Sequence, residues 1–164
     1  MSPLPILGLA LVVALLVAVP VALAAEGEAG MSREEYVAKV EPICKTNTEA
    51  NSRILTGVKD QVKQGKLVPA GKRFIRASGA LGKSVAQIAQ VPKPAADAAK
   101  LTKWVGYLKK EKSFLFSIGK ALKSNQKGKA QKLAVKLNDN NEDANNTVIN
   151  FNFKECRIES SRFI

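Results

Sequence analysis

Residues 69–94 read PAGKRFIRASGALGKSVAQIAQVPKP, and this stretch decides which fold the rest of the chain can adopt. Its apolar side chains recur every three or four residues, which is the spacing of one face of a helix. Pro69 suits the first turn of a helix, where a missing N–H costs nothing. The two prolines of VPKP at residues 91–94 form a rigid turn that ends it. We therefore predict an amphipathic helix from Pro69 to about Gln90, whose buried stripe is Phe74, Ala77, Leu81, Val85 and Ile88.

The same spacing recurs on both sides of this helix. The sequence SREE at residues 32–35 has the pattern of a capping box and predicts the start of a first helix, which Gly65 ends. Pro42 should kink that helix or mark its first turn. A third helix is expected over about 95–124, and a fourth over about 129–150 after the break at residues 125–128.

Strand signals are missing, and four helices joined by short links alternate in direction. The sequence therefore predicts an all-α protein, an up-down-up-down four-helix bundle. Gly79 and Gly82 either weaken the second helix or allow another helix to pack closely against it.

An uncharged apolar run from Leu4 to Ala25 precedes the bundle. Ala22 and Ala24 supply the small-x-small pattern that signal peptidase accepts. However, the first three residues contain no Lys or Arg, and a bilayer-spanning helix also needs about 20 apolar residues. We interpret residues 1–25 as a signal peptide or a retained N-terminal transmembrane anchor, 26–31 as a linker and 32–164 as the helical bundle. Both interpretations place the bundle outside the cytoplasm, secreted or associated with the envelope.

Cys44 and Cys156 are the two cysteines of the chain. In an oxidising compartment two cysteines most simply pair with each other. An up-down-up-down bundle also brings the start of its first helix beside the end of its fourth, where these residues lie. A redox function would favour a close pair such as C-x-x-C. We therefore predict a structural Cys44–Cys156 disulfide.

Tyr36 lies eight residues before Cys44, and Phe153 lies three residues before Cys156. In these features at its two ends, the chain resembles small exported bacterial helical proteins of unknown function that have one cysteine near each end. The resemblance implies no activity.

The net charge of +12 is concentrated in the middle of the chain. Residues 61–137 contain 18 basic and 2 acidic residues, whereas residues 26–60 and 138–164 each have a net charge of −2. Such a block attracts polyanions, although no recognised nucleic-acid-binding motif is present. The candidate anion-binding residues, expected on one side of the second and third helices, are Lys72, Arg73, Arg76, Lys83, Lys103, Lys110 and Lys112.

Four asparagines, Asn47, Asn51, Asn141 and Asn145, fall on or beside the apolar stripes of the first and fourth helices. In an antiparallel pair they would lie at about the same height. There they would fix the register of the helices, as buried asparagine does in coiled coils, or line a small-molecule pocket. The third interpretation is that they point to solvent.

No catalytic residue, metal site or cofactor is predicted. The chain has no histidine, which is the commonest general base and metal ligand, and no glycine-rich phosphate loop. The acidic tract NDNNED at residues 138–143 lacks the glycine and the final glutamate of a calcium loop, because Ala144 and Asn150 occupy those positions. Trp104, Tyr107 and Phe114 form a second apolar stripe on the third helix, which is either buried or offered to a partner.

The function expected from these features is non-enzymatic. Our first hypothesis is an exported basic helical bundle that binds an anionic envelope component through residues 61–137: lipid headgroups, a wall polymer or extracellular DNA. The alternative is a membrane-tethered structural or protein-interaction domain, whose partner is unknown and which would use the Trp104 stripe.

Overall fold

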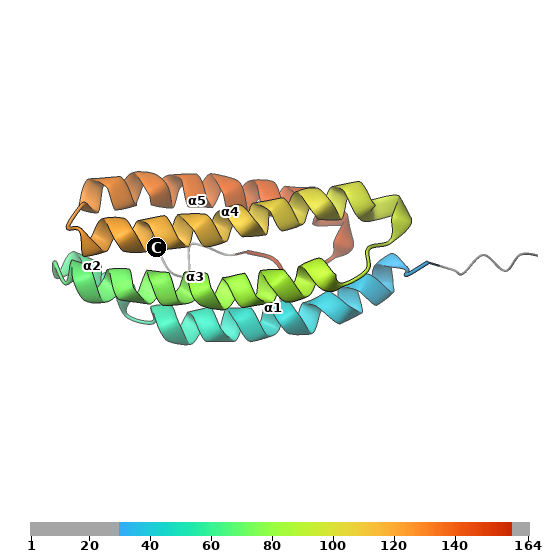
Figure 1. Cartoon of the computed structure of the whole chain (residues 1–164), viewed down its shortest axis with the longest axis horizontal. Helices are drawn as coiled ribbons and strands as arrows, with labels where there is room; N and C mark the ends of the chain where they lie inside the picture. Colours follow the sequence, from blue (N-terminus) through green and yellow to red (C-terminus); the bar gives the residue numbers. More distant parts are fainter. Residues whose placement is uncertain (1–29, 159–164) are drawn as a thin grey trace, which may run out of the picture.

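The computed structural model of the chain describes residues 30–158, which are helical and contain no strand. Four long helices alternate in direction along the chain (Figure 1). The expected signal peptide or anchor lies outside the described residues; within them, no helix is long and apolar enough to cross a membrane. The elements are α1 (Arg33–Leu55), α2 (Val58–Lys63), α3 (Leu67–Gln90), the 3₁₀ turn η1 (Ala95–Asp97), α4 (Ala98–Lys123), α5 (Lys127–Thr147) and the 3₁₀ turn η2 (Ile149–Phe151).

The start of α1 confirms the predicted capping box. The Ser32 hydroxyl accepts a hydrogen bond from the backbone N–H of Glu35 at 3.1 Å, and the Glu35 carboxylate accepts one from the backbone N–H of Ser32 at 2.8 Å. The predicted end at Gly65 is wrong, because α1 already ends at Leu55. Gly57 has φ +75°, a left-handed conformation that an α-helix does not continue, and α2 is a separate short helix.

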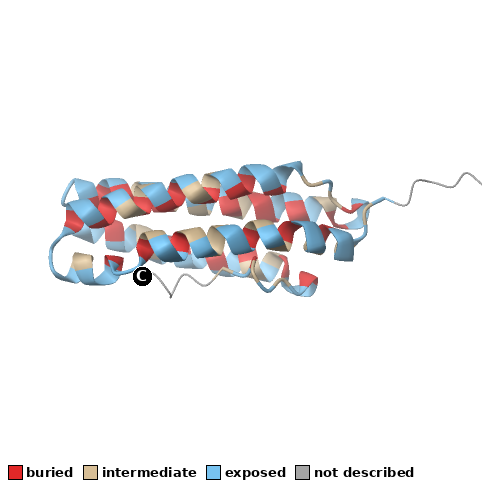
Figure 2. Cartoon of the chain, turned by 90° about the horizontal axis from the view of Figure 1, so that it is seen from below, coloured by how far each residue is buried: buried red, intermediate tan, exposed pale blue. Residues whose placement is uncertain are grey.

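Helix α3, together with α4, lies at the centre of the packing. It contacts α1 and α2 on one side and α4 on the other, and α4 in turn packs against α5. All five residues of its predicted apolar stripe are buried. Buried residues follow the sides that the helices turn toward one another, and exposed residues cover the outside (Figure 2). The stripe thus places the core where the spacing predicted it.

Helices α3 and α4 make a tight backbone contact at Gly71 and Gly119, two glycines that the sequence analysis did not single out. A Cβ atom added at Gly71 would lie 2.5 Å from the carbonyl oxygen of Gly119, and one added at Gly119 would lie 2.7 Å from that of Gly71. By contrast, Gly79 faces open space, and Gly82 faces the side chain of Lys112. The absence of side chains at Gly71 and Gly119 therefore sets the distance between the two helices.

The second apolar stripe of α4 belongs to the core. Trp104 is fully buried and stacks on Phe153 with their ring centroids 5.2 Å apart, and Phe153 stacks on Phe151 at 5.6 Å. Tyr107 and Phe114 are partly buried against the same core. Contacts within the chain therefore cover Trp104 fully and the other two residues of the stripe in part.

Candidate functional site

The basic candidates on α3 and α4 are exposed, with one exception. Nη1 of Arg73 donates hydrogen bonds to the carbonyl oxygens of Ile54 and Thr56, so this guanidinium satisfies acceptors at the end of α1. Arg73 thus differs from the other candidates, whose side chains are exposed. The exposed candidates are Lys72, Arg76, Lys83, Lys103, Lys110 and Lys112.

These exposed cations form two groups. Arg76 and Lys83 lie four and eleven residues after Lys72. At about 100° per residue these three residues share one stripe of α3, and this stripe points away from the core. Lys112 joins them, because its side chain lies beside Gly82 of α3. We call these four residues the α3 basic stripe.

The second group lies on the other side of α4. The ammonium nitrogens of Lys103 and Lys110 lie 5.8 and 5.3 Å from the centroid of the Tyr107 ring. The backbone carbonyl of Tyr107 accepts a hydrogen bond from Asn140 of α5 at 3.1 Å, which places this group next to α5. The predicted cations thus extend around α4 instead of sharing one flat side.

Both acidic residues of the 61–137 segment are removed from this outer surface. Asp97 is 5% exposed, and its carboxylate accepts hydrogen bonds from Nε and Nη2 of Arg33 at 2.8 and 2.9 Å. The hydrogen bonds from Arg33 lower the pKa of Asp97. Glu111 lies on the inward side of α4 and lines a cavity. No acidic residue therefore offsets the cations on the outer surface of α3, α4 and the first half of α5.

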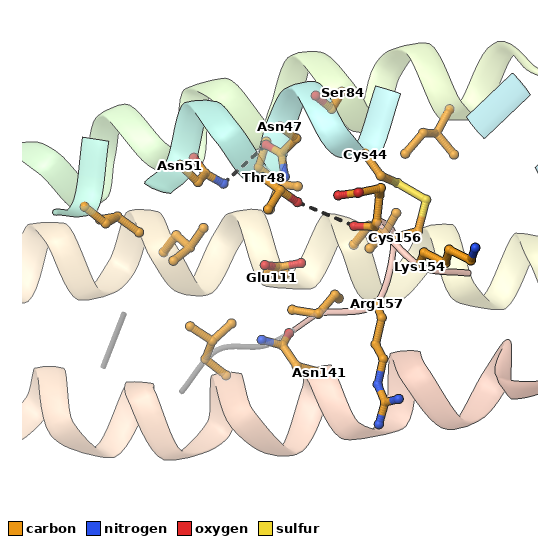
Figure 3. A pocket seen from close by; sticks show the side chains of 18 of the residues that line it. Cys44, Asn47, Thr48, Asn51, Ser84, Glu111, Asn141, Lys154, Cys156 and Arg157 are labelled. Carbon is orange, nitrogen blue, oxygen red and sulfur yellow. Dashed lines mark hydrogen bonds between the residues drawn. A yellow bond between two sulfur atoms is a disulfide. The ribbon is translucent and has the colours of Figure 1, made fainter. Parts of the chain in front are cut away.

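The cavity brings together three of the four predicted asparagines (Figure 3). Asn47 and Asn51 extend from α1, where Nδ2 of Asn51 donates to Oδ1 of Asn47 at 3.2 Å, and Asn141 extends from α5. Asn51 and Asn141 are only 7% and 2% exposed. Asn145 does not face Asn51, so the predicted layer is incomplete, and its remaining members line a cavity.

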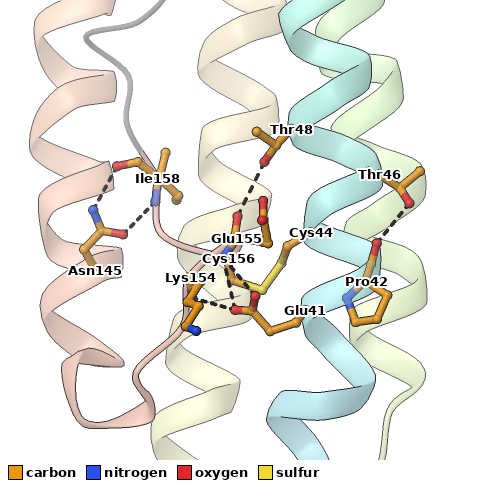
Figure 4. Close-up of a disulfide and its surroundings, with 10 residues drawn as sticks. All are labelled: Glu41, Pro42, Cys44, Thr46, Thr48, Asn145, Lys154, Glu155, Cys156 and Ile158. Carbon is orange, nitrogen blue, oxygen red and sulfur yellow. Dashed lines mark hydrogen bonds between the residues drawn. A yellow bond between two sulfur atoms is a disulfide. The ribbon is translucent and has the colours of Figure 1, made fainter.

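Asn145 instead holds the C-terminal tail, residues 152–158, which lies between α1 and α5 (Figure 4). Its side chain donates to the carbonyl of Ile158 and accepts from the N–H of Ile158, both at 2.9 Å. On α1, the carboxylate of Glu41 accepts hydrogen bonds from the backbone N–H groups of Lys154 at 2.8 Å and of Glu155 at 2.9 Å. The tail thus connects the two outer helices.

The predicted disulfide is confirmed and lies in the same region. Cys44 of α1 is bonded to Cys156 of the tail, with their Cα atoms 5.0 Å apart. A disulfide is compatible with an oxidising compartment outside the cytoplasm.

Replacing Asn145 by Ala should lower the free energy of unfolding by about 1–2 kcal/mol, because the Ile158 backbone loses both hydrogen bonds. Urea unfolding measures this loss, and amide hydrogen exchange at Ile158 should become faster. The matched control is Asn146→Ala on the exposed side of α5. Equal stability of the two variants would contradict this assignment.

Glu111 is the site residue that the sequence analysis missed. It lies three residues after Leu108 and four before Leu115, both of which are buried, so it falls on the core stripe of α4. The surrounding sequence KKEK at residues 109–112 has the composition of a solvent-exposed face. The helical spacing was the signal that could have separated Glu111 from its lysine neighbours.

Within residues 30–158, no group of three Cys, Asp or Glu side chains is placed to hold a metal ion. The acidic tract at 138–143 forms part of α5. Comparisons of the chain with protein-family models, with curated proteins and with solved structures found no match.

Proposed function

We propose that this protein is exported and binds an anionic component of the cell envelope through the basic outer surface of α3, α4 and the first half of α5. The strongest support is the position of the two acidic residues of the 61–137 segment. Asp97 is paired with Arg33, and Glu111 faces the interior cavity. The exposed cations of α3, α4 and the first half of α5 therefore face the surroundings with no acidic residue on the same outer surface. The apolar run before the bundle and the Cys44–Cys156 disulfide support export.

A surface of this kind recognises charge density and not a sequence. Lysine ammonium groups act as point charges on phosphate oxygens, and each contact releases a counterion from the polyanion. Phe116 adds an apolar group, since it is 46% exposed and lies 5.9 Å below the ammonium of Lys120. An aromatic ring among lysines suits a lipid interface, whereas a soluble polymer needs only the charges.

The candidate ligands are distinguished by measuring the affinity of the purified protein for three anions: phosphatidylglycerol vesicles, a phosphate-bearing wall polymer and double-stranded DNA. Affinity for the physiological anion should fall about tenfold or more between 50 and 200 mM salt if several contacts form. Vesicles of phosphatidylcholine and an uncharged polymer should bind poorly. Binding that does not depend on salt would contradict the proposal. It would mean that the positive charge serves only to keep the protein soluble.

Reversing Lys72, Arg76 and Lys83 to Glu should reduce anion affinity at least about tenfold while leaving helix content unchanged, because these head groups lie in water. The matched control reverses three exposed cations of α1 (Lys39, Lys45 and Arg53), which changes the net charge by the same amount. Equal losses in both variants would show that net charge alone attracts the anion.

The N-terminus of the exported protein separates this proposal from the alternative of a membrane-tethered domain. A mature chain beginning at Ala25 or Glu26 excludes the tether, whereas an intact Met1 supports it. In the stripe that the alternative would use, Trp104 is fully buried, whereas Tyr107 and Phe114 are partly exposed.

A further inference from the structure

A cavity of about 300 Å³ lies between α1, α3, α4 and α5 and is bordered by the C-terminal tail (Figure 3). It is on the inward side of α3 and α4, away from the α3 basic stripe. Its volume is at the lower end of the range found for small-molecule sites. Its apolar walls are formed by Leu55, Phe74, Leu81, Leu108, Leu115 and Leu137.

Two buried amide groups of this cavity lack a partner within the described residues. They are Oδ1 of Asn51, an acceptor, and Nδ2 of Asn141, a donor. The other ends of both side chains are engaged, since Asn51 donates to Asn47 and Asn141 accepts from Asn140. A buried polar atom without a hydrogen bond costs about 1–3 kcal/mol, so these two atoms need partners from outside the chain, which ordered water or a bound ligand supplies.

Glu111 places a carboxyl group at the middle of the same cavity (Figure 3). The polar residues that face this cavity from the other helices are uncharged: Asn47, Thr48 and Asn51 on α1, Ser84 on α3 and Asn141 on α5. Charged residues border it only on the tail, where Lys154 and Arg157 are exposed, Glu155 is partly buried, and Arg157 extends toward α5.

Burial raises the pKa of Glu111 to about 8, and no ion pair to it is formed within residues 30–158. At pH 7 the Glu111 carboxyl group is therefore mostly protonated. A cation that entered the cavity would reverse this preference, because an opposite charge stabilises the ionised form.

We propose that this cavity binds a small amphiphilic primary amine, with its apolar body between the leucines and its ammonium group on Glu111. The two carboxylate oxygens of Glu111 can accept hydrogen bonds from a primary ammonium group, and Oδ1 of Asn51 is a further acceptor in the lining of the same cavity. Nδ2 of Asn141 can donate to a hydroxyl or carbonyl oxygen of the ligand. An anionic ligand would meet a carboxyl group and no buried cation, which disfavours it.

Calorimetric titration with n-hexylamine, n-hexanol and hexanoate tests the proposal, because the three probes share a six-carbon body and differ in the head group. The amine should bind one-to-one and at least about tenfold more tightly than either of the others, a difference of about 1.4 kcal/mol. Equal affinities, preference for hexanoate or no binding of the amine would overturn the proposal.

Glu111→Gln keeps the shape of the side chain and removes its charge. We expect it to weaken hexylamine binding at least about tenfold and to leave hexanol binding unchanged. Binding to the unaltered protein at pH 7 should release close to one proton, seen as a dependence of the apparent enthalpy on the buffer, and the variant should release none. The control, Glu142→Gln, changes an exposed carboxylate of α5 and should have neither effect. Undiminished amine binding in Glu111→Gln would overturn the proposal.

A final variant tests whether the chain fills its own cavity. The sequence continues for six residues after Ile158, which itself borders the site. A chain truncated after Ile158 should bind hexylamine as the full chain does. Amine binding that appears only after truncation would overturn the proposal, because the C-terminus would then be the natural occupant.

Discussion

Replacing Cys156 by Ser is expected to lower the free energy of unfolding by about 4–5 kcal/mol, the loss that chain entropy assigns to a loop of this length. The bonded cysteines are 112 residues apart, so the bond restricts nearly the whole helical domain in the unfolded state. Helix content should be retained, because the buried stripes of the four long helices remain. Urea unfolding, followed by circular dichroism, measures both quantities.

The decrease in the free energy of unfolding of Cys156→Ser is controlled by a second variant and by chemical reduction of the disulfide. Cys44→Ser and reduction of the unaltered protein should reach the same stability as Cys156→Ser, and the double variant should lose nothing more. The mass of the protein taken from the compartment to which we propose it is exported, before and after reduction and alkylation, tests the bond in cells. Two free thiols there would contradict the pairing and the export that it supports.

The central part of the fold could be predicted from the sequence because its signals are local. Prolines at 69, 92 and 94 and the regular apolar spacing place α3, its buried side and its end at Gln90 without reference to any other segment. The break in α1 could not be placed in this way. Val58 and Val62 continue the apolar spacing past Gly57, and one glycine in a periodic segment is compatible with either a helix or a turn.

The candidate site was predicted in part, and its missing pieces depend on tertiary contacts. Asparagine on an apolar stripe is visible in the sequence, and so Asn51 and Asn141 were identified. Asn145 is hydrogen-bonded to the backbone of Ile158. Because nearly every residue has the same backbone groups, the sequence does not indicate which of them a side chain will bind. The tail enters between α1 and α5 because Cys44 and Glu41 hold it there, a placement that the spacing of the helices does not indicate.

Gly71→Ala is expected to destabilise the protein by about 3 kcal/mol, the upper part of the range for an overpacked core. The new methyl group would lie 2.5 Å from the carbonyl oxygen of Gly119 and 2.9 Å from the backbone nitrogen of Lys123. Both are backbone atoms of α4 and have no side-chain rotamer through which to move away. The two helices would therefore have to separate at this contact.

Gly79→Ala provides the matched control on the same helix. No atom lies within 4 Å of its added Cβ, and the residue is exposed, so the change should stabilise the protein by about 0.5–1 kcal/mol through helix propensity. Urea unfolding midpoints of the two variants should therefore move in opposite directions. Gly119→Ala should resemble Gly71→Ala, since its Cβ would meet the carbonyl oxygen of Gly71 at 2.7 Å. A Gly71→Ala variant as stable as the unaltered protein would mean that α3 and α4 are farther apart in solution than this contact requires.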